Sequence, residues 1–302
     1  MTKTPDFLKK GDLVGILSPA GIVKPSNIDP AIQLISDWGL RIVKGNHLYK
    51  QHNFFAGTDE QRLEDFQTML DNPEIRAIFC SRGGYGIIKL IDKLNFGNFL
   101  QSPKWIIGYS DITIFHIIIN QQLKCKSLHG LMPNNFRYLE PDNISLTSLK
   151  NLLFGESMEY SVEYDKLNKS GRASGELIGG NLSIIYSLQG TNYELDTTNK
   201  ILFIEDTNED IYHIDRMMMN LKLSGKLKSM NGLMVGGMSK IKDTQPGYGK
   251  TANEVVLEMV NEYDYPVIFG FQAGHMYPNL ALYMGHQIEM HVHENGAGIK
   301  FI

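Results

Sequence analysis

Trp105-Ile106-Ile107-Gly108-Tyr109-Ser110-Asp111-Ile112-Thr113-Ile114-Phe115-His116 is the stretch around which the chain is organised. An apolar run typical of a buried strand breaks at Ser110, and apolar residues then recur with helical spacing. A serine on a tight strand-to-helix turn exposes its hydroxyl at the sheet edge, where the unpaired N–H groups of the new helix also point. This arrangement suits attack on a carbonyl carbon. Taken alone, however, the stretch favours a simple N-cap role for Ser110, because it lacks the second glycine of the G-x-S-x-G elbow.

The composition is that of a globular chain without an extreme charge. The 302 residues are 42% hydrophobic, which predicts one large domain or two moderate ones with a full core. The 29 basic and 33 acidic residues give a formal charge of -4 and form no long run of one sign, which argues against nucleic-acid binding.

Cysteine usage and hydropathy bear on the compartment. Cys80 and Cys125 form neither a C-x-x-C motif nor a secretory disulfide framework. Residues 1–10 contain no apolar core of a signal peptide, and the longest apolar stretch, 112–119, is too short to span a membrane. We therefore expect a cytoplasmic protein that acts on a small molecule or peptide, without membrane or nucleic-acid partners.

Strand-like and helix-like segments alternate along the first half of the chain. The pattern predicts strands that begin near residues 12, 40, 75, 105 and 126, and helices over 28–38, 58–70 and 84–94. Thr58 and Gln61 form a capping box ahead of the second helix. Such alternation predicts a parallel sheet with helices on its faces.

The pattern loosens between residues 131 and 174, where Pro and Gly recur, and we place the domain boundary there. The expected domains are 1–155 and 156–302. The second contains expected helices at 179–188, 211–223 and 252–263, and expected strands at 200–205, 232–236, 266–270 and 287–292.

Polar residues follow the expected strands at four places: residues 81–86, the Ser110 turn, residues 205–209 and residues 270–276. Open α/β sheets bind ligands at the carboxyl ends of their strands. The four segments supply a serine, acids and a histidine. A serine hydroxyl becomes a good nucleophile when an imidazole takes its proton, and the imidazole needs an acid to orient it and stabilise its cation.

His275 is the best candidate for the base, because it follows a glycine in a loop. His116 lies on an apolar helix face and is expected to be a packed core residue, and His213 is expected at a surface. His291 and His293 alternate along one strand and face the same side, but no further ligand pattern accompanies them, so we expect no metal and no cofactor.

Glu205 is the preferred acid, because it ends a buried strand where a carboxylate needs a partner; Asp206 is the fallback. The glycine turn at 82–86 allows two interpretations. Its amides could grip a nucleotide or sugar phosphate in a non-catalytic binding protein, although it matches no phosphate-binding motif. Alternatively, one of its N–H groups and the amide of Asp111 form an oxyanion hole. Cys80 is a poor nucleophile candidate because it lies inside a strand.

Six short motifs occur along the chain: Ser-Arg-Gly-Gly-Tyr-Gly at 81–86, Ile-Gly-Tyr-Ser-Asp-Ile-Thr at 107–113, Gly-Gly-Asn-Leu-Ser at 179–183, Phe-Ile-Glu-Asp at 203–206, Ile-Asp-Arg-Met at 214–217 and Gly-His at 274–275. Together and in this order they resemble the LD-carboxypeptidases of the muramoyl-tetrapeptide carboxypeptidase type, serine peptidase family S66. The resemblance runs from Gly11 nearly to the C-terminus.

The resemblance implies a catalytic triad of Ser110, Glu205 and His275, with an oxyanion hole formed by the amides of Asp111 and Gly84. It implies an α/β protein whose N-terminal parallel-sheet domain, flavodoxin-like or class I amidotransferase-like, is followed by a smaller β-rich α/β domain. It also implies a cytoplasmic homodimer without a cofactor.

The implied reaction is removal of the terminal D-alanine from murein tetrapeptides in peptidoglycan recycling. A related branch, of the microcin C immunity type, instead cleaves the amide of peptidyl or aminoacyl nucleotides and carries a tryptophan where this chain has Gln189-Gly190, which favours the peptidase here. Arg82, Tyr85 and Asn181 are candidate substrate contacts. Arg82 is either a clamp for a free carboxylate or a surface residue in a salt bridge. Met276 replaces a glycine of many relatives.

Overall fold

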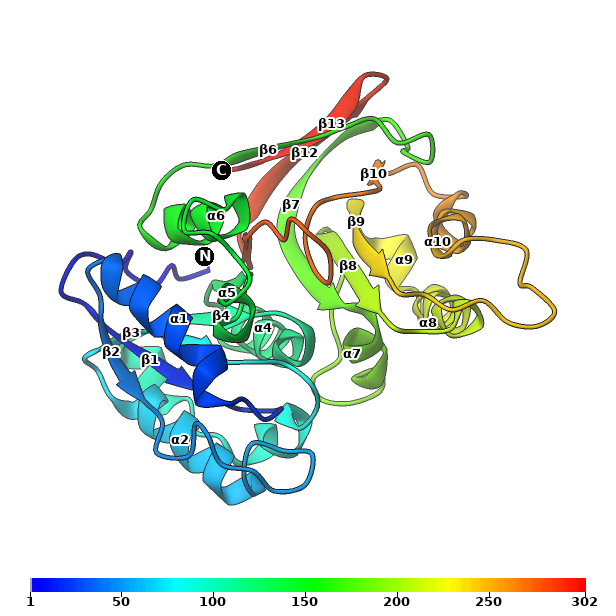
Figure 1. Ribbon diagram of the computed structural model, residues 1–302. Coiled ribbons are helices and arrows are strands. Elements are labelled where there is room, and N and C mark those ends of the chain that lie inside the picture. The colour runs from blue at the N-terminus through cyan, green and yellow to red at the C-terminus, as the bar shows by residue number, and fades with distance from the viewer. Residues whose placement is uncertain (1) are drawn as a thin grey trace. The chain divides into compact units, whose positions relative to one another are not determined.

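The computed structural model describes residues 2–302, which divide into two compact units (Figure 1). Unit 1 comprises residues 2–156 together with Leu280–Tyr283. Unit 2 comprises Ser157–Asn279 and Met284–Ile302. The return of residues 280–283 to unit 1 is a feature that the sequence pattern did not indicate.

A six-stranded sheet forms the centre of unit 1, in the order β11-β5-β4-β3-β1-β2. Pairing is parallel from β2 through β1, β3 and β4 to β5. The order 2-1-3-4-5 is that of flavodoxin-like sheets, whose ligand site lies at the carboxyl ends of the strands. The strands are β1 (Leu13–Leu17), β2 (Arg41–Lys44), β3 (Ile75–Cys80), β4 (Trp105–Gly108), β5 (Ser127–His129) and β11 (Leu282–Met284).

Helices cover both faces of this sheet, and Figure 1 shows α1 and α2 on opposite sides of it. Thr58 caps α2 in the expected capping box with Gln61. The expected helix over 84–94 is wrong, because this segment forms a glycine turn and two short 3-10 helices. The helices are α1 (Pro25–Asp37), α2 (Asp59–Asp71), η1 (Ile87–Lys89), η2 (Ile91–Lys93), α3 (Gly97–Gln101), η3 (Ser110–Ile112), α4 (Thr113–Ile117), η4 (Ile118–Gln122), α5 (Pro133–Phe136) and α6 (Ile144–Leu153).

Aromatic side chains connect the returning segment to the core of unit 1. The ring of Trp105 lies 5.3 Å from the ring of Tyr283 and 6.1 Å from that of Phe7. The hydroxyl of Tyr283 donates to the carbonyl of Leu152, and the backbone N–H of Ala281 donates to Ser148 Oγ at 3.0 Å. These contacts bury apolar surface and satisfy polar atoms at once, which explains why β11 joins this sheet.

Unit 2 contains a seven-stranded mixed sheet in the order β10-β9-β8-β7-β12-β13-β6. The part from β7 through β8 and β9 to β10 is parallel, and the part from β7 through β12 and β13 to β6 is antiparallel. The strands are β6 (Glu159–Val162), β7 (Gly171–Asn181), β8 (Ile201–Thr207), β9 (Gly232–Ser239), β10 (Val267–Ile268), β12 (Gln287–His293) and β13 (Gly296–Phe301).

The helices of unit 2 follow the parallel strands. They are α7 (Leu182–Ser187), α8 (Ile211–Leu223), α9 (Lys226–Ser229) and α10 (Ala252–Val260). Helix α8 has the expected bounds, whereas α7 begins later than expected, because Gly179–Asn181 still belong to β7. Regular elements also occupy half of residues 131–174, where the sequence indicated only a loosened pattern.

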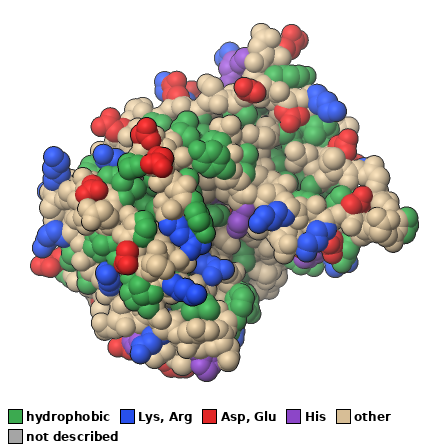
Figure 2. Space-filling model, viewed as in Figure 1, with side chains coloured by type: hydrophobic (Ala, Val, Ile, Leu, Met, Phe, Trp, Pro, Cys, Tyr) green, Lys and Arg blue, Asp and Glu red, His purple; other side chains and the backbone are tan. Residues whose placement is uncertain are grey.

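None of the helices formed by residues 2–302 has the length and apolar character needed to cross a lipid bilayer. Figure 2 shows acidic and basic side chains interspersed over one face of the molecule, with hydrophobic side chains between them.

The buried side chain of Lys104 closes the C-terminal end of α2. Its ammonium group donates to the carbonyls of Met69 at 2.9 Å, Leu70 at 2.9 Å and Asn72 at 2.7 Å. Burial lowers the pKa of Lys104 to about 8. These bonds satisfy carbonyls that the helix itself leaves without partners.

We expect Lys104→Met to lower the free energy of unfolding by about 2 to 3 kcal/mol, because it leaves buried carbonyls without donors. Urea denaturation followed by circular dichroism measures this. The exposed Lys9 provides the control, since Lys9→Met should change the unfolding free energy by less than about 0.5 kcal/mol. Equal unfolding midpoints for the two variants would contradict the assignment.

Candidate active site

The backbone of Ser110 lies in the left-handed region, with φ at 66°. Non-glycine residues rarely adopt this conformation, and it recurs where a nucleophile is held on a sharp turn after a strand. Ser110 is the first residue of η3, its side chain is partly exposed, and the N-cap of η3 is Tyr109 without a side-chain bond. The N-cap interpretation of Ser110 is therefore wrong, and the turn has the strained form of an elbow although no second glycine follows.

The glycine turn after β3 lies against Ser110. A Cβ atom on Gly83 would lie 2.8 Å from Ser110 Cβ and 2.9 Å from Ser110 Oγ, so only glycine fits at this position. Gly84 has φ at 124° and is exposed, and Gly21 donates its N–H to the carbonyl of Gly83 at 3.1 Å. The glycine turn after β3 thus contacts both the loop after β1 and the serine turn after β4.

The fully buried His116 holds the last residue of β4 by a hydrogen bond. Its Nε2 lies 2.9 Å from the carbonyl of Gly108, so Nε2–H is the donor and Nδ1 accepts from the hydroxyl of Ser127 at 2.8 Å. Burial lowers the pKa of His116 to about 4, although the bond to Gly108 opposes this shift. His116 is a neutral packed core residue, as expected.

The side chain of Asp111 is buried beside the same turn. Its Oδ2 accepts the backbone N–H of Ile87 at 3.0 Å. Burial raises the pKa of Asp111 to about 6, against the effects of the N–H groups of Ile87 and Gly86 and of the charge on Arg62. The Asp111 carboxyl group thus binds the backbone where the glycine turn leads into η1.

In unit 2, the carboxylate of Glu205 is fully buried and bonded to His275. Its Oε2 accepts the backbone N–H of His275 at 3.0 Å and lies 2.7 Å from Nδ1 of the ring. The pairing of β8 with β9 shifts register between Ile204 and Asp206, so Glu205 lies at a bulge, a device that redirects side chains next to functional sites. The structure pairs the histidine with Glu205 and not with the fallback Asp206.

Gly274 allows this close approach. A Cβ atom there would lie 2.5 Å from Glu205 Cγ and 2.6 Å from Oε2. Burial lowers the pKa of His275, but the hydrogen bond and charge of Glu205, together with the charge of Asp206, raise it more, so the net pKa lies above 6.5. A ring held by a carboxylate through Nδ1 presents Nε2 for proton transfer.

Asn181 connects the two adjacent carboxylates. Its amide donates to Glu205 Oε1 at 3.3 Å and to Asp206 Oδ1 at 3.1 Å. Its Oδ1 accepts from Ser183 Oγ at 2.7 Å and from the N–H of Ile184 at 3.2 Å, which caps α7. Burial, followed by the charge of Glu205, raises the pKa of Asp206 to about 6. These contacts favour a role for Asn181 in orienting Glu205.

Arg82 and Tyr85 are exposed next to the glycine turn. Arg82 Nη1 donates to the carbonyl of Ile22 at 3.1 Å, and within residues 2–302 Arg82 forms no ion pair. Tyr85 is 46% exposed, and its ring lies 6.1 Å from that of Phe55. Because Arg82 is exposed, its guanidinium is accessible to a ligand.

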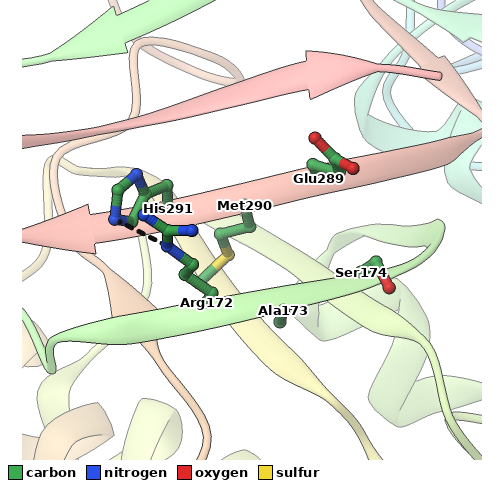
Figure 3. Close-up of a pocket in the computed structure, with 6 residues that line it drawn as sticks. All are labelled: Arg172, Ala173, Ser174, Glu289, Met290 and His291. Carbon is green, nitrogen blue, oxygen red and sulfur yellow. Dashed lines mark hydrogen bonds between the residues drawn. The ribbon is translucent and has the colours of Figure 1, made fainter.

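The remaining histidine candidates lie elsewhere in unit 2. His213 pairs with Glu209, and His291 and His293 occupy the exposed face of β12. Figure 3 shows Arg172 on β7 and His291 on the neighbouring strand pointing toward one another, at a cavity of about 420 Å³ that does not include Glu205 or His275. Among residues 2–302, no three His, Cys, Asp or Glu side chains are grouped as a metal site requires.

The structure thus brings the predicted residues together in two groups, one in each unit. Unit 1 holds the Ser110 turn with Asp111 and the glycine turn 82–86, and unit 2 holds Asn181, Glu205 and His275. Sequence reasoning missed one buried residue, Arg62, although it lies four residues before Phe66 on the apolar face of α2, a spacing that indicates burial.

Residues 14–130 match the family model for the LD-carboxypeptidase N-terminal domain of peptidase family S66, and residues 174–290 match the model for the C-terminal domain. The chain is 34% identical over 299 residues to the probable murein peptide carboxypeptidase of Bacillus subtilis (strain 168), covering 98% of this chain and 94% of the relative.

Two further proteins are similar to more than nine tenths of the chain. The microcin C7 self-immunity protein MccF of Escherichia coli is 26% identical over 311 residues, covering 92% of this chain and 90% of that protein. The crystal structure of muramoyltetrapeptide carboxypeptidase from Oxalobacter formigenes matches with a TM-score of 0.87 and 25% identity, covering 96% of this chain and 98% of that one.

The contact between Glu205 and His275 predicts an elevated imidazole pKa. We expect an NMR titration to give His275 a pKa above 6.5, and we expect Glu205→Gln to lower it below 6.5, because burial then outweighs the remaining charges. Glu209→Gln is the control, since Glu209 bonds to His213. A pKa of His275 that is unchanged in Glu205→Gln would refute the assigned contact.

Proposed function

Because the chain belongs to the LD-carboxypeptidase family, peptidase family S66, we propose that it is a serine carboxypeptidase that hydrolyses the L,D peptide bond to the terminal D-alanine of murein tetrapeptides. The observation that carries this proposal is the hydrogen bond between His275 and the buried Glu205, which orients the imidazole as a base. Relatives of the chain are named carboxypeptidases. The left-handed Ser110 beside Gly83 supports the serine as the nucleophile.

In the proposed mechanism, Ser110 Oγ attacks the scissile carbonyl carbon while His275 Nε2 accepts the hydroxyl proton. The amides of Asp111 and Gly84 stabilise the negative oxygen of the tetrahedral intermediate. The intermediate collapses, the C–N bond breaks, and the imidazolium protonates the departing amine of D-alanine. Water then attacks the acyl-enzyme with His275 again as the base, which restores Ser110. Glu205 orients the ring and stabilises its positive charge.

A carboxypeptidase must recognise the free carboxylate of its substrate. We assign this role to Arg82, because its guanidinium is exposed next to the glycine turn and matches a carboxylate in geometry. Tyr85 is the second assigned contact, since its ring is exposed at the same turn. Asn181 contributes by holding Glu205.

The family resemblance further supports a homodimer that acts in the cytoplasm during peptidoglycan recycling. Cys80 and Cys125 are both buried and not in disulfides, as suits a reducing compartment. We expect sedimentation equilibrium to give twice the 34.1 kDa mass of the chain. A mass of 34.1 kDa at all concentrations would exclude the dimer.

Ser110→Ala and His275→Ala should each lower kcat for D-alanine release by a similar factor, on the order of 10⁴ to 10⁶, because triad members act as a unit. Release of D-alanine from murein tetrapeptide, measured with purified protein, tests this. The control is His213→Ala, which removes a histidine bonded to Glu209 and should leave kcat unchanged. Near wild-type activity of Ser110→Ala would eliminate the proposed nucleophile.

The second candidate function is hydrolysis of peptidyl or aminoacyl nucleotide amides. The extensive match to the microcin C7 self-immunity protein favours it, whereas Gln189-Gly190 favours the peptidase. Parallel assays on murein tetrapeptide and on an acyl-sulfamoyl adenylate separate the two. We expect the larger kcat/KM for the tetrapeptide, and a larger value for the adenylate would reverse the assignment.

A further inference from the structure

One peptide group next to the glycine turn is held at both ends by buried side chains of opposite charge. Arg62 Nη1 donates to the carbonyl of Gly86 at 3.1 Å, and Asp111 Oδ2 accepts the N–H of Ile87 at 3.0 Å. The carbonyl and the N–H belong to the same planar unit, so the two contacts together fix its orientation. Arg62 and Asp111 are each 1% exposed.

Arg62 extends this contact to a second loop. Its Nη1 also donates to the carbonyl of Pro19 at 2.6 Å, in the loop that follows β1, and its Nη2 bonds to Asp59 on α2. The ring of Phe55 lies 5.1 Å from the guanidinium carbon. Since Asp111 belongs to the turn after β4, the two side chains tie together the segments that follow β1, β3 and β4.

The charges are costly at this position. Among residues 2–302, Asp111 Oδ1 and Arg62 Nε are buried without a hydrogen-bond partner. A buried charged group with an unsatisfied atom destabilises a fold, because its interactions with water are only partly replaced. The charged side chains at this position are therefore better explained by their orienting the Gly86–Ile87 peptide than by a contribution to the stability of the fold.

The glycine turn needs such an external constraint. Residues 83, 84 and 86 are glycines, which have wide conformational freedom, and Gly83 contacts the side chain of Ser110. Ile87 begins η1, only three residues after Gly84. Fixing the peptide group between Gly86 and Ile87 therefore restricts where the amide of Gly84 can point.

We propose that Arg62 and Asp111 are positioning residues that clamp the Gly86–Ile87 peptide and so hold the Gly83–Gly84 turn against Ser110 in the geometry that oxyanion binding requires. This role rests on the proposed function. It is separate from the role of the Asp111 backbone amide, because it belongs to the carboxylate.

The clamp predicts a specific kinetic signature for Asp111→Ala. An oxyanion donor acts in the transition state, so its misplacement should lower kcat by about 10- to 100-fold and change KM by less than about 3-fold. Asp111→Asn keeps an oxygen acceptor for the N–H of Ile87 and should retain kcat within about 5-fold of wild type. Release of D-alanine from murein tetrapeptide gives both constants.

Asp65→Ala is the matched control. Asp65 lies on α2, is 5% exposed and accepts the backbone N–H of His47 at 2.9 Å. Like Asp111→Ala, this substitution therefore leaves a backbone N–H without its buried carboxylate acceptor. It should lower the melting temperature but leave kcat unchanged. An equal fall in kcat for Asp65→Ala and Asp111→Ala, or no recovery in Asp111→Asn, would overturn the clamp.

Hydrogen exchange of the backbone amides over residues 82–87, followed by mass spectrometry, tests the clamp without relying on the reaction. Exchange should be faster in Asp111→Ala than in wild type, and unchanged in Asp65→Ala. Exchange as slow in Asp111→Ala as in wild type would refute the clamp. If the wild-type protein releases no D-alanine, the proposed function fails, and the exchange rates alone decide whether the clamp exists.

Discussion

The burial of two adjacent carboxylates at the end of β8 is the constraint on which the chemistry of unit 2 depends. Glu205 and Asp206 are 0% and 1% exposed, and a carboxylate in such surroundings requires donors that replace water. The donors come from three segments: the amide of Asn181 and the N–H of Ser183 where β7 meets α7, the N–H of Thr207 on β8, and the backbone and ring of His275. The hydrogen bonds of His275 therefore serve two purposes at once, because they compensate the buried carboxylate of Glu205 and orient the imidazole.

Unit 1 meets a different requirement, which is to keep a serine in a conformation that its side chain disfavours. The left-handed backbone of Ser110 costs on the order of 1 to 3 kcal/mol and persists where the surroundings leave no alternative. His116 fixes the carbonyl of Gly108, two residues before Ser110, and the absence of a side chain at Gly83 leaves room for Ser110. The hydrogen bonds of Arg62 and Asp111 belong to the same group of restraints.

Much of this organisation follows from local sequence signals. The pattern of residues 211–223 coincides with α8, because a long amphipathic pattern of helical period is a strong signal. The apolar run at 75–80 coincides with β3, because its length is that of a strand and too short for most helices. The segment 84–94 does not form the expected helix, since its apolar residues are preceded by glycines whose backbone serves the turn. The left-handed Ser110 and the bulge at Glu205 lie beyond sequence reasoning, because long-range packing imposes them. The hydrogen bonds of Asn181 likewise depend on β7 and β8 being neighbours.

Strand β11 has a consequence for how the polypeptide emerges from the ribosome. Residues 280–283 complete the sheet of unit 1, yet they are made after nearly all of unit 2. At a synthesis rate of about 5 to 20 residues per second, the edge of β5 waits on the order of ten seconds for its neighbour. An open strand edge attracts other chains during such an interval. The N-terminal unit is thus a discontinuous folding unit that no single cut in the coding sequence can isolate intact.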